Sequence, residues 1–296
     1  MHFKIAICLT SYDRLDCARI NQEIFKLNFS QSYIVVHASS GATATQYLED
    51  AFVHCQPLPH FAGAISLMKT AIKAALPFEP DFLVVLDGDI WLLEEKYLLK
   101  VIQCLHDNPS LLMSTCAWMN LPRFHMTRLA MEIADIVSIP VDRMRRLMSL
   151  PRRMTYDAMD FCTQFFILRN YKPLIDLFCK MPTDNHRMVE RQWFDLFSTY
   201  FDLERVLRMR EREPVHPDHR FACEQIGLHC EHWPAAGTSE NSPKKNNPYF
   251  IKPGTPGKRE ALERYPHIRK GESIQKLLKA TDPADLSYYN SGAKRY

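Results

Sequence analysis

The sequence predicts an α/β fold, in which a mostly parallel, Rossmann-like sheet is flanked by helices. Two observations predict it: short apolar runs with strand character alternate with segments whose apolar residues fall at helical spacing, and the runs end in polar loops. Runs that are apolar on both faces are typical of strands buried in a parallel sheet. The composition, 46% hydrophobic and 24% charged, is that of a globular protein and excludes a collagen-like or wholly disordered chain.

The first third of the chain carries the clearest pattern. Residues 5–9 and 33–36 are expected to be strands, and the segment 15–27 between them has apolar residues near helical spacing behind capping candidates. Residues 63–76 repeat the helical pattern, and residues 82–86 repeat the strand pattern. This order predicts two consecutive strand–helix–strand units.

The rest of the chain is less regular. A further strand is expected at 161–168, an apolar stretch covers 111–121, and further helices are expected at 97–105, 188–201, 258–264 and 273–280. A stretch rich in Ser, Asn, Pro, Gly and Lys predicts a long loop over 236–256. We therefore expect a domain over residues 1–235, divided into halves 1–110 and 111–235, and a C-terminal segment over 236–296.

Charge and composition exclude several classes of protein. The net charge of +3, from 37 basic and 34 acidic residues, is too small to indicate a nucleic-acid binder, and none is expected as a partner. No glycine-rich phosphate-binding loop is present. Nine cysteines without a Cys-x-x-Cys pair, and an N-terminus that leads directly into a strand, favour a cytoplasmic location. No segment is expected to span a membrane, since acidic residues or prolines interrupt the apolar stretches.

The most informative motif is Asp87-Gly88-Asp89, which ends the most apolar expected strand. The carboxyl ends of parallel strands open onto the ligand crevice of such sheets, so these carboxylates should face a site. A divalent cation takes oxygen ligands and would neutralise phosphate where a glycine loop is missing. The alternative is a solvated turn, for which Asp-Gly is a common dipeptide.

Two segments show a resemblance to a known family: Asp87-Gly88-Asp89, and Thr10-Ser11-Tyr12-Asp13-Arg14 at the end of the first strand. The chain resembles the GT-A glycosyltransferases, in which an Asp-x-Asp motif follows a strand of a Rossmann-like sheet. The resemblance covers roughly residues 1–110 and implies the fold and the reaction class, without specifying the sugar. It implies that residues 1–110 bind a nucleotide-sugar donor and that residues 111–235 face the acceptor.

The resemblance also implies roles for individual residues. Thr10, Tyr12 and Arg14 would lie against the nucleotide, although Arg14 has an equal alternative as a cap of the sheet edge. Asp89, with or without Asp87, would ligate Mn²⁺ or Mg²⁺ on the diphosphate, with Gly88 in the same donor-binding loop.

At the end of the second strand the chain departs from the family. In the family, an acidic residue near this position contacts the nucleotide base, and here His37 takes its place. The identity of the nucleotide base is therefore not predicted, and His37 is a candidate for the contact with it.

A cluster of histidines and cysteines between residues 216 and 232 has three interpretations. His229 or His232 would complete the shell of the donor metal, as a late histidine does in several GT-A families. The cluster could instead hold a structural zinc ion, or its members could be ordinary hydrogen-bonded histidines.

Carboxylates that could act as a base on the acceptor side are Glu190, Asp184 and Asp195. The alternative for each is helix capping or a surface ion pair. Lys244, next to Lys245, could fold over the donor diphosphate, or the pair could be solvated.

These observations together predict a metal-dependent glycosyltransferase that moves a sugar from a nucleotide-diphosphate donor, with a UDP-sugar favoured, to a glycan or lipid-linked acceptor. The arginine-rich segment 143–153 could contact an anionic membrane surface at its inner face, cover the acceptor cleft or join copies of the chain. The rival functions are a nucleotidyltransferase of similar fold and a zinc-stabilised nucleic-acid or protein binding module.

Overall fold

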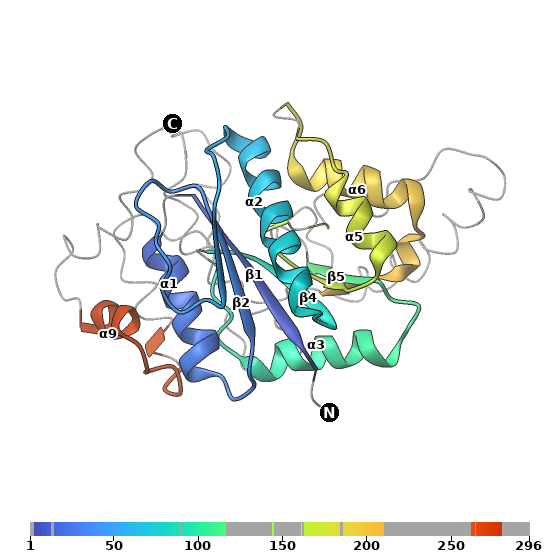
Figure 1. Ribbon diagram of the computed structural model, residues 1–296. Helices are drawn as coiled ribbons and strands as arrows, with labels where there is room; N and C mark the ends of the chain where they lie inside the picture. The colour runs from blue at the N-terminus through green and yellow to red at the C-terminus, as the bar shows by residue number, and fades with distance from the viewer. Residues whose placement is uncertain are drawn as a thin grey trace, which may run out of the picture.

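A seven-stranded sheet in the order β3-β2-β1-β4-β6-β5-β7 forms the centre of the molecule (Figure 1). The computed structural model describes residues 3–12, 15–88, 90–116, 144, 161, 163–183, 186–209, 262–263 and 265–279. The strands are β1 Ile5–Ser11, β2 Ile34–Ser39, β3 Ala51–His54, β4 Phe82–Asp87, β5 Met113–Cys116, β6 Phe165–Arg169 and β7 Val206–Met209. Strand β6 is antiparallel to its neighbours β4 and β5, and every other pairing is parallel. The predicted α/β class with a mostly parallel sheet is confirmed.

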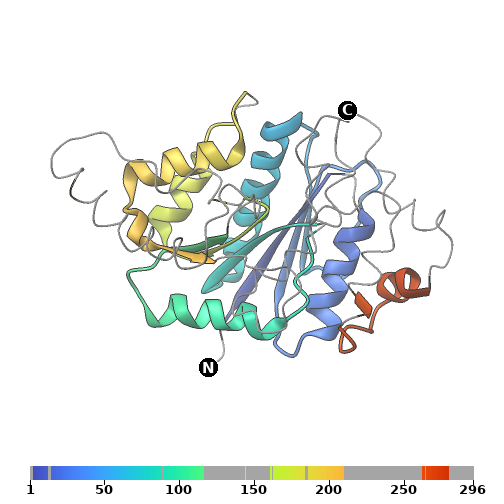
Figure 2. The same ribbon diagram turned by 180° about the vertical axis from the view of Figure 1, so that it is seen from behind.

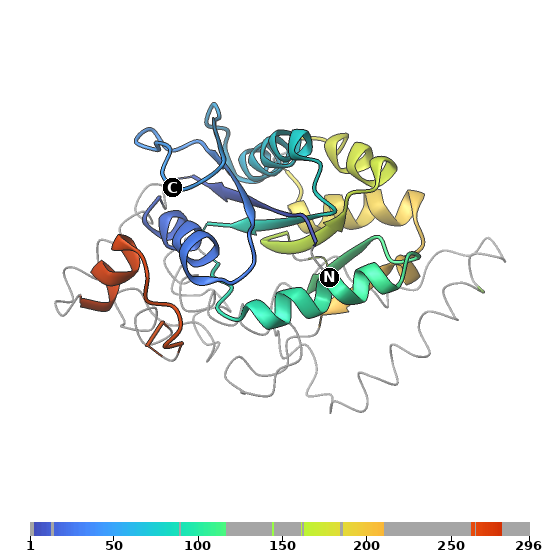
Figure 3. The same cartoon turned by 60° about the horizontal axis from the view of Figure 1, so that its bottom comes forward.

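Helices cover both faces of the sheet. They are α1 Leu15–Glu23, α2 His60–Ala75, α3 Glu95–Asp107, α5 Lys172–Cys179, α6 Val189–Tyr200 and α9 Glu272–Lys279. Helices α2, α5 and α6 lie over one face, and α1 and α3 lie over the other, as the tilted view and the view from behind show (Figures 2 and 3). The sheet is therefore the middle of three layers.

The alternation of side chains along β1 explains why its apolar run is uninterrupted. Ala6 and Cys8 belong to the core under α2, whereas Ile5, Ile7 and Leu9 belong to the core under α1 and α3. All five side chains are fully buried, because successive residues of a strand point to opposite faces and both faces are covered.

A third apolar cluster joins the two ends of the chain. It unites α1 with residues after β4 and with the C-terminal segment 262–279, through Cys17, Ile20, Ile24, Trp91, Leu93, Leu262, Ile268, Ile274 and Leu277. Helix α9, in red, lies beside α1 in Figure 1.

A buried carboxylate fixes this contact. Glu23 accepts hydrogen bonds from the backbone N–H groups of Ser273 and Ile274, each at 2.8 Å, and from the hydroxyl of Tyr47 at 2.7 Å. Gly271 has φ 125°, and a Cβ there would lie 2.2 Å from Glu23 Oε2, so both the backbone conformation and the close approach require glycine. Burial and the Glu23 carboxylate raise the pKa of Tyr47 to about 12.

Several elements differ from the sequence prediction. Strands β3 and β7 and helix α5 were not predicted, and the antiparallel direction of β6 was not foreseen. Of the apolar stretch 111–121, only Met113–Cys116 is described as a strand. The division at residue 235 stays a prediction, since residues 210–261 lie outside the described part.

We expected no segment long and apolar enough to span a membrane, and for Phe61–Phe78 this expectation is wrong. These 18 residues have a mean hydropathy of 1.2, which by length and composition alone is enough for a membrane-spanning helix. This helical segment includes most of α2. Its inner residues Ile65, Met68 and Ile72 are at most 2% exposed and pack in the core beneath the sheet. Its apolar character is therefore explained by the core.

The stability of the fold should fall in acid through Glu95, at the start of α3. Its carboxylate accepts hydrogen bonds from the N–H and hydroxyl of Ser30, the N–H of Gln31 and the hydroxyl of Tyr33, at 2.6 to 3.0 Å. Partial burial opposes ionisation, but these bonds outweigh it and hold the pKa of Glu95 below its ordinary value of 4.5. A lowered carboxyl pKa stabilises the fold above the ordinary value, and this contribution is lost as pH falls through the folded pKa.

We expect Glu95→Gln to lower the melting temperature at pH 7 and to make its decline between pH 6 and pH 3.5 shallower than in the wild type, because the carboxylate contribution is already missing. Circular dichroism at a series of pH values would measure this. The exposed Glu79→Gln serves as the matched control and should reproduce the wild-type curve. A Glu95→Gln curve parallel to the wild type would contradict the assignment.

Candidate functional site

The candidate site lies at the edge of the sheet where β1, β2 and β4 end. These strands are parallel, and Thr10 is in register with Asp87 while Ser11 is in register with Ser39, so their last residues meet at one edge. Strand β6 is antiparallel and therefore begins at this edge. Gln164, just before β6, accepts a hydrogen bond from the N–H of Asp87 at 2.9 Å.

The two sequence segments that resemble the glycosyltransferase motifs are brought together here. The hydroxyl of Thr10 donates to Oδ1 of Asp87 at 2.8 Å. Thr10 is 5% exposed, so little water competes for this bond. A hydrogen bond donated to a carboxylate is stronger than one between neutral groups and fixes the orientation of the Asp87 side chain.

The backbone after Asp87 turns tightly against β1. The N–H of Gly88 donates to the carbonyl of Thr10 at 2.7 Å, and the N–H of Ile90 donates back to the carbonyl of Asp87 at 3.0 Å. A Cβ on Gly88 would lie 2.9 Å from the Thr10 oxygen and 3.1 Å from Cβ of Ala18. Only glycine fits this approach, which gives the middle residue of the motif a steric role. We call residues 87–90 the acidic turn.

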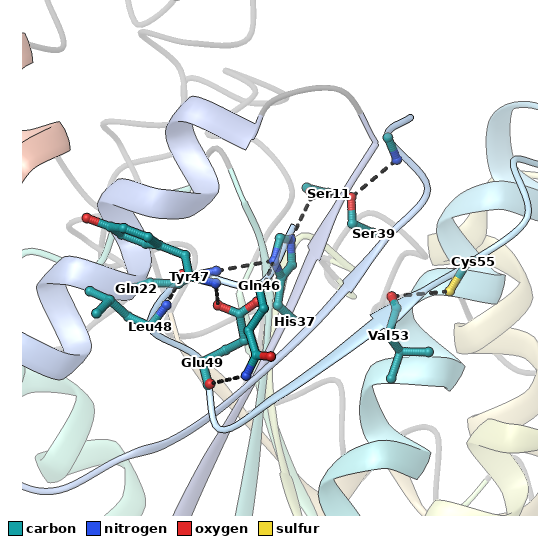
Figure 4. Close-up of polar contacts among 11 residues, drawn as sticks. Ser11, Gln22, His37, Ser39, Gln46, Tyr47, Leu48, Glu49, Val53 and Cys55 are labelled. Atoms are coloured by element: carbon teal, nitrogen blue, oxygen red, sulfur yellow. Dashed lines mark hydrogen bonds and ion pairs between the residues drawn. The ribbon is translucent and has the colours of Figure 1, made fainter. Parts of the chain in front are cut away.

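Behind the strand ends lies a buried polar network (Figure 4). The N–H of Leu48 donates to Oε1 of Gln22 at 3.1 Å, so the Nε2 group of Gln22 faces Nδ1 of His37, at 3.2 Å, as donor. The ring therefore carries its hydrogen on Nε2 and donates it to the hydroxyl of Ser11 at 2.8 Å, and Ser11 donates to Ser39 at 3.0 Å.

His37 is fully buried, with both ring nitrogens bonded to protein. Direct contact with a nucleotide base, as predicted for His37, would require it to give up one of these bonds. In this arrangement it supports Ser11 and Ser39 from behind.

Glu49 completes a Ser–His–acid series, with Oε1 at 3.8 Å from Nδ1 of His37. Burial opposes ionisation of Glu49, but the backbone N–H groups of Glu49 itself and of Tyr47 favour the carboxylate, and the pKa of Glu49 lies below its ordinary value. The series does not form a nucleophilic triad in this state, because His37 presents an N–H to Ser11 and has no lone pair there to accept a proton.

Of the two predicted acceptor-side carboxylates that the structure describes, Glu190 and Asp195, Glu190 is connected to this edge. It lies in the first turn of α6, is 5% exposed, and accepts a hydrogen bond from the hydroxyl of Thr163 at 2.7 Å. Thr163 adjoins Gln164, which binds the backbone of Asp87. Asp87 and Glu190 are therefore linked by two hydrogen bonds through two neighbouring residues.

Asp195 lies on another side of α6, because five residues at about 100° each separate it from Glu190 by about 140° around the helix. Its carboxylate is held by Arg187 at 2.6 Å and by Arg191 at 3.1 Å. This is the surface ion pair that the sequence offered as the alternative for Asp195.

Other predicted site residues are not all described. Tyr12 directly follows β1 and is 39% exposed. Outside the described residues lie Arg14, Asp89, Asp184, His229, His232, Lys244 and, except for Met144, the segment 143–153. Their roles stay predictions. Thr163 and Gln164 were not among the predicted site residues, and only a correct placement of β6 beside β4 could have identified them.

The chemistry of the edge suits a hard cation. Within the described ranges, no group of three or more His, Cys, Asp or Glu residues forms a metal site. The groups that do meet there carry oxygen: the Thr10 hydroxyl contacts the Asp87 carboxylate, and the backbone carbonyl of Gln164 contacts the Asp87 N–H. Oxygen donors fit Mg²⁺ or Mn²⁺ and do not fit a thiolate-bound zinc ion.

Comparisons with known proteins give structural likenesses alone. No protein-family model matches the chain, and no curated protein matches its sequence. The chain is similar to glucosyl-3-phosphoglycerate synthase from Mycobacterium tuberculosis, in complex with Mn²⁺, uridine diphosphate and glucosyl-3-phosphoglycerate, at 11% identity over 70% of each chain, with a TM-score of 0.41.

Two further structures have TM-scores of 0.41. Mannosyl-3-phosphoglycerate synthase from Rubrobacter xylanophilus is 14% identical over 77% of this chain and 71% of its own. The 4-diphosphocytidyl-2C-methyl-D-erythritol synthase from Anaerococcus prevotii is 12% identical over 71% of this chain and 87% of its own. Scores of this size do not define an activity.

The steric requirement at Gly88 gives a direct test of the turn. In Gly88→Ala the new methyl group would meet the backbone oxygen of Thr10, which cannot rotate away. We expect the free energy of unfolding to fall by about 1–3 kcal/mol, as in other overpacked sites. Urea denaturation would measure it, with Thr43→Ala on the exposed loop after β2 as control. An unchanged urea midpoint for Gly88→Ala would show that the turn relaxes freely.

Proposed function

We propose that this chain is a divalent-metal-dependent glycosyltransferase that transfers a sugar from a nucleotide-diphosphate sugar, with UDP as the expected nucleotide, to a glycan or lipid-linked acceptor. One observation carries the proposal: Thr10, from one motif segment, donates a hydrogen bond at 2.8 Å to Asp87, from the other. Two segments about 75 residues apart in sequence, each resembling part of a donor site, form a single edge at the carboxyl ends of parallel strands.

On the donor side, Tyr12 would stack on the base and Arg14 would bind phosphate or sugar oxygens with its planar fork. Ser11 and Ser39, supported by His37, would line the floor beneath the base. Lys244 would approach the diphosphate from the C-terminal segment. Asp87 and Asp89 would hold Mn²⁺ or Mg²⁺, with His229 or His232 as a further ligand.

The bound cation would act as a Lewis acid on the leaving diphosphate. This chain's own residues would orient the groups that react. Thr10 holds the Asp87 carboxylate in one orientation, which limits the reorganisation needed when a donor binds. The close contact of Gly88 with β1 keeps the acidic turn against the strand edge.

On the acceptor side, Glu190 is our proposed base. It would remove the proton of the acceptor hydroxyl as the diphosphate leaves, in a transfer that inverts the sugar. Asp184 is the remaining alternative, and Asp195 is the least favoured because two arginines hold it.

We further propose that the enzyme works in the cytoplasm and that the arginine-rich segment 143–153 contacts the inner face of a membrane near a lipid-linked acceptor. The zinc-stabilised module has less support, since its ligand cluster between residues 216 and 232 has no Cys-x-x-Cys pair. A nucleotidyltransferase would have the same type of sheet, and the products of its reaction distinguish it from a glycosyltransferase.

A thermal-shift screen tests donor and metal binding. UDP with Mn²⁺ should raise the melting temperature more than UDP or Mn²⁺ alone, because the cation and the diphosphate bind each other and so bind the protein more tightly together. A ligand at about 100 times its Kd adds about 2.7 kcal/mol of stability. In Asp89→Ala the combined shift should disappear while the melting temperature without ligand is unchanged. Shifts by CDP and GDP would identify the nucleotide.

The products of the reaction distinguish the rivals. With a UDP-sugar, release of UDP supports transfer or donor hydrolysis. Formation of UTP and a sugar phosphate from the UDP-sugar and pyrophosphate would favour the nucleotidyltransferase. Tightly bound zinc near one equivalent, with no shift by any nucleotide, would favour the binding module.

The base is tested by Glu190→Gln. Thr163 can still donate to the amide oxygen, so the fold should persist. We expect the transfer rate to fall about 100-fold or more, with the UDP-induced thermal shift unchanged. Asp195→Asn, on the same helix, should retain nearly the wild-type rate. A Glu190→Gln enzyme as fast as the wild type would reject Glu190 as the base.

A further inference from the structure

Helix α1 carries an asparagine that donates hydrogen bonds to the backbone of the acidic turn. Asn21 is fully buried, and its side-chain amide nitrogen donates to the carbonyl of Gly88 at 2.9 Å and to the carbonyl of Ile90 at 2.7 Å. These two carbonyls belong to the residues immediately before and after Asp89 in the sequence. One planar NH₂ group therefore spans the backbone on both sides of the predicted metal ligand.

The helix that carries Asn21 is itself held from two sides. Ala18 and Phe25 pack in the core under the sheet, whereas Cys17 and Ile20 pack against the C-terminal segment. Trp91, two residues after Asp89, donates its indole N–H to the carbonyl of Cys17 at 3.3 Å. The amide of Asn21 thus projects from a support with little freedom to move, and the turn takes its position from that support.

Stability alone is a weak reason for a polar side chain at this place. The Oδ1 atom of Asn21 is buried and has no hydrogen-bond partner among the described residues. A buried polar atom without a partner is destabilising, and this loss offsets much of what the two donated bonds contribute. The remaining effect of Asn21 is geometric, because its two hydrogen bonds fix the distance between the carbonyl groups of Gly88 and Ile90.

We propose that Asn21 is a positioning residue for the metal-binding turn, which it holds in the shape that divalent cation binding requires. This inference rests on the proposed function. Groups that orient metal ligands without touching the metal commonly change metal affinity about 10- to 100-fold when they are removed. Asn21 would act on Asp87 and Asp89 through the backbone between them.

Asn28 is a matched control on the same stretch of chain. Its amide nitrogen also donates to two carbonyls, those of Glu23 at 2.8 Å and Lys270 at 2.7 Å, but neither belongs to the acidic turn. Asn28→Ala therefore removes the same kind of donated bonds, together with two bonds that Oδ1 of Asn28 accepts from the N–H groups of Arg269 and Lys270, each at 2.8 Å, and it loosens the C-terminal segment instead. A general loss of stability would affect both variants.

The experiment is a titration of Mn²⁺ into the full chain with UDP held constant, with free Mn²⁺ followed by electron paramagnetic resonance. Asn21→Ala should raise the Kd for Mn²⁺ about 10-fold or more, and Asn28→Ala should leave it at the wild-type value. Melting temperatures of all variants are measured in parallel without ligand. If Asn21→Ala does not fold, Asn21→Leu fills the same volume without the donors and should show the same loss.

The outcomes separate this inference from the proposed function. A wild-type Kd in Asn21→Ala, or equal weakening in both asparagine variants, overturns the positioning role and leaves the transferase proposal in place. If the wild-type chain itself binds no Mn²⁺ with UDP, the proposed function fails, and the inference falls with it. Weakening confined to the Asn21 variants supports the positioning role.

Discussion

The close contact between the ends of β1 and β4 is the constraint on which the candidate site depends. Three bonds meet there: the Thr10 hydroxyl to Asp87, the Gly88 N–H to the Thr10 carbonyl, and the Asp87 N–H to Gln164. Because backbone groups make two of them, the turn can approach the strand only if residue 88 has no side chain. The acidic motif therefore combines one steric requirement with one electrostatic requirement, and both are met at a single register of the parallel pair.

Helix α1 connects this edge to the rest of the molecule. One side of it packs on the sheet and Asn21 holds the acidic turn. Its last residue, Glu23, and Asn28 in the turn that follows it bind the segment 262–279. The polar groups involved are buried or half-buried, so their bonds are exchanged with water less readily than surface contacts. The site and the C-terminal segment are thus organised by the same helix.

Much of the fold could be predicted from sequence, because β1, β2 and β4 are apolar on both faces and their connecting helices keep a helical period. The short strands β3 and β7 have too few residues to show a period, and the direction of β6 depends on pairings with β4 and β5 that no local pattern encodes. In the site, Thr10 and Asp87 were predictable from their motifs. The hydrogen bonds of Asn21 and Thr163 were not, because each bonds a residue distant in sequence, and the burial of His37 depends on Gln22 and Glu49.

The third apolar cluster has a consequence for how the chain is made. Cys17, Ile20, Ile24, Trp91 and Leu93 are covered by residues that leave the ribosome about 170 or more positions later. Until residues 262–277 have emerged, the growing chain exposes an indole and several aliphatic groups beside its own acidic turn. The nascent protein is therefore open to chaperone binding and aggregation on that flank until residues 262–277 can pack there.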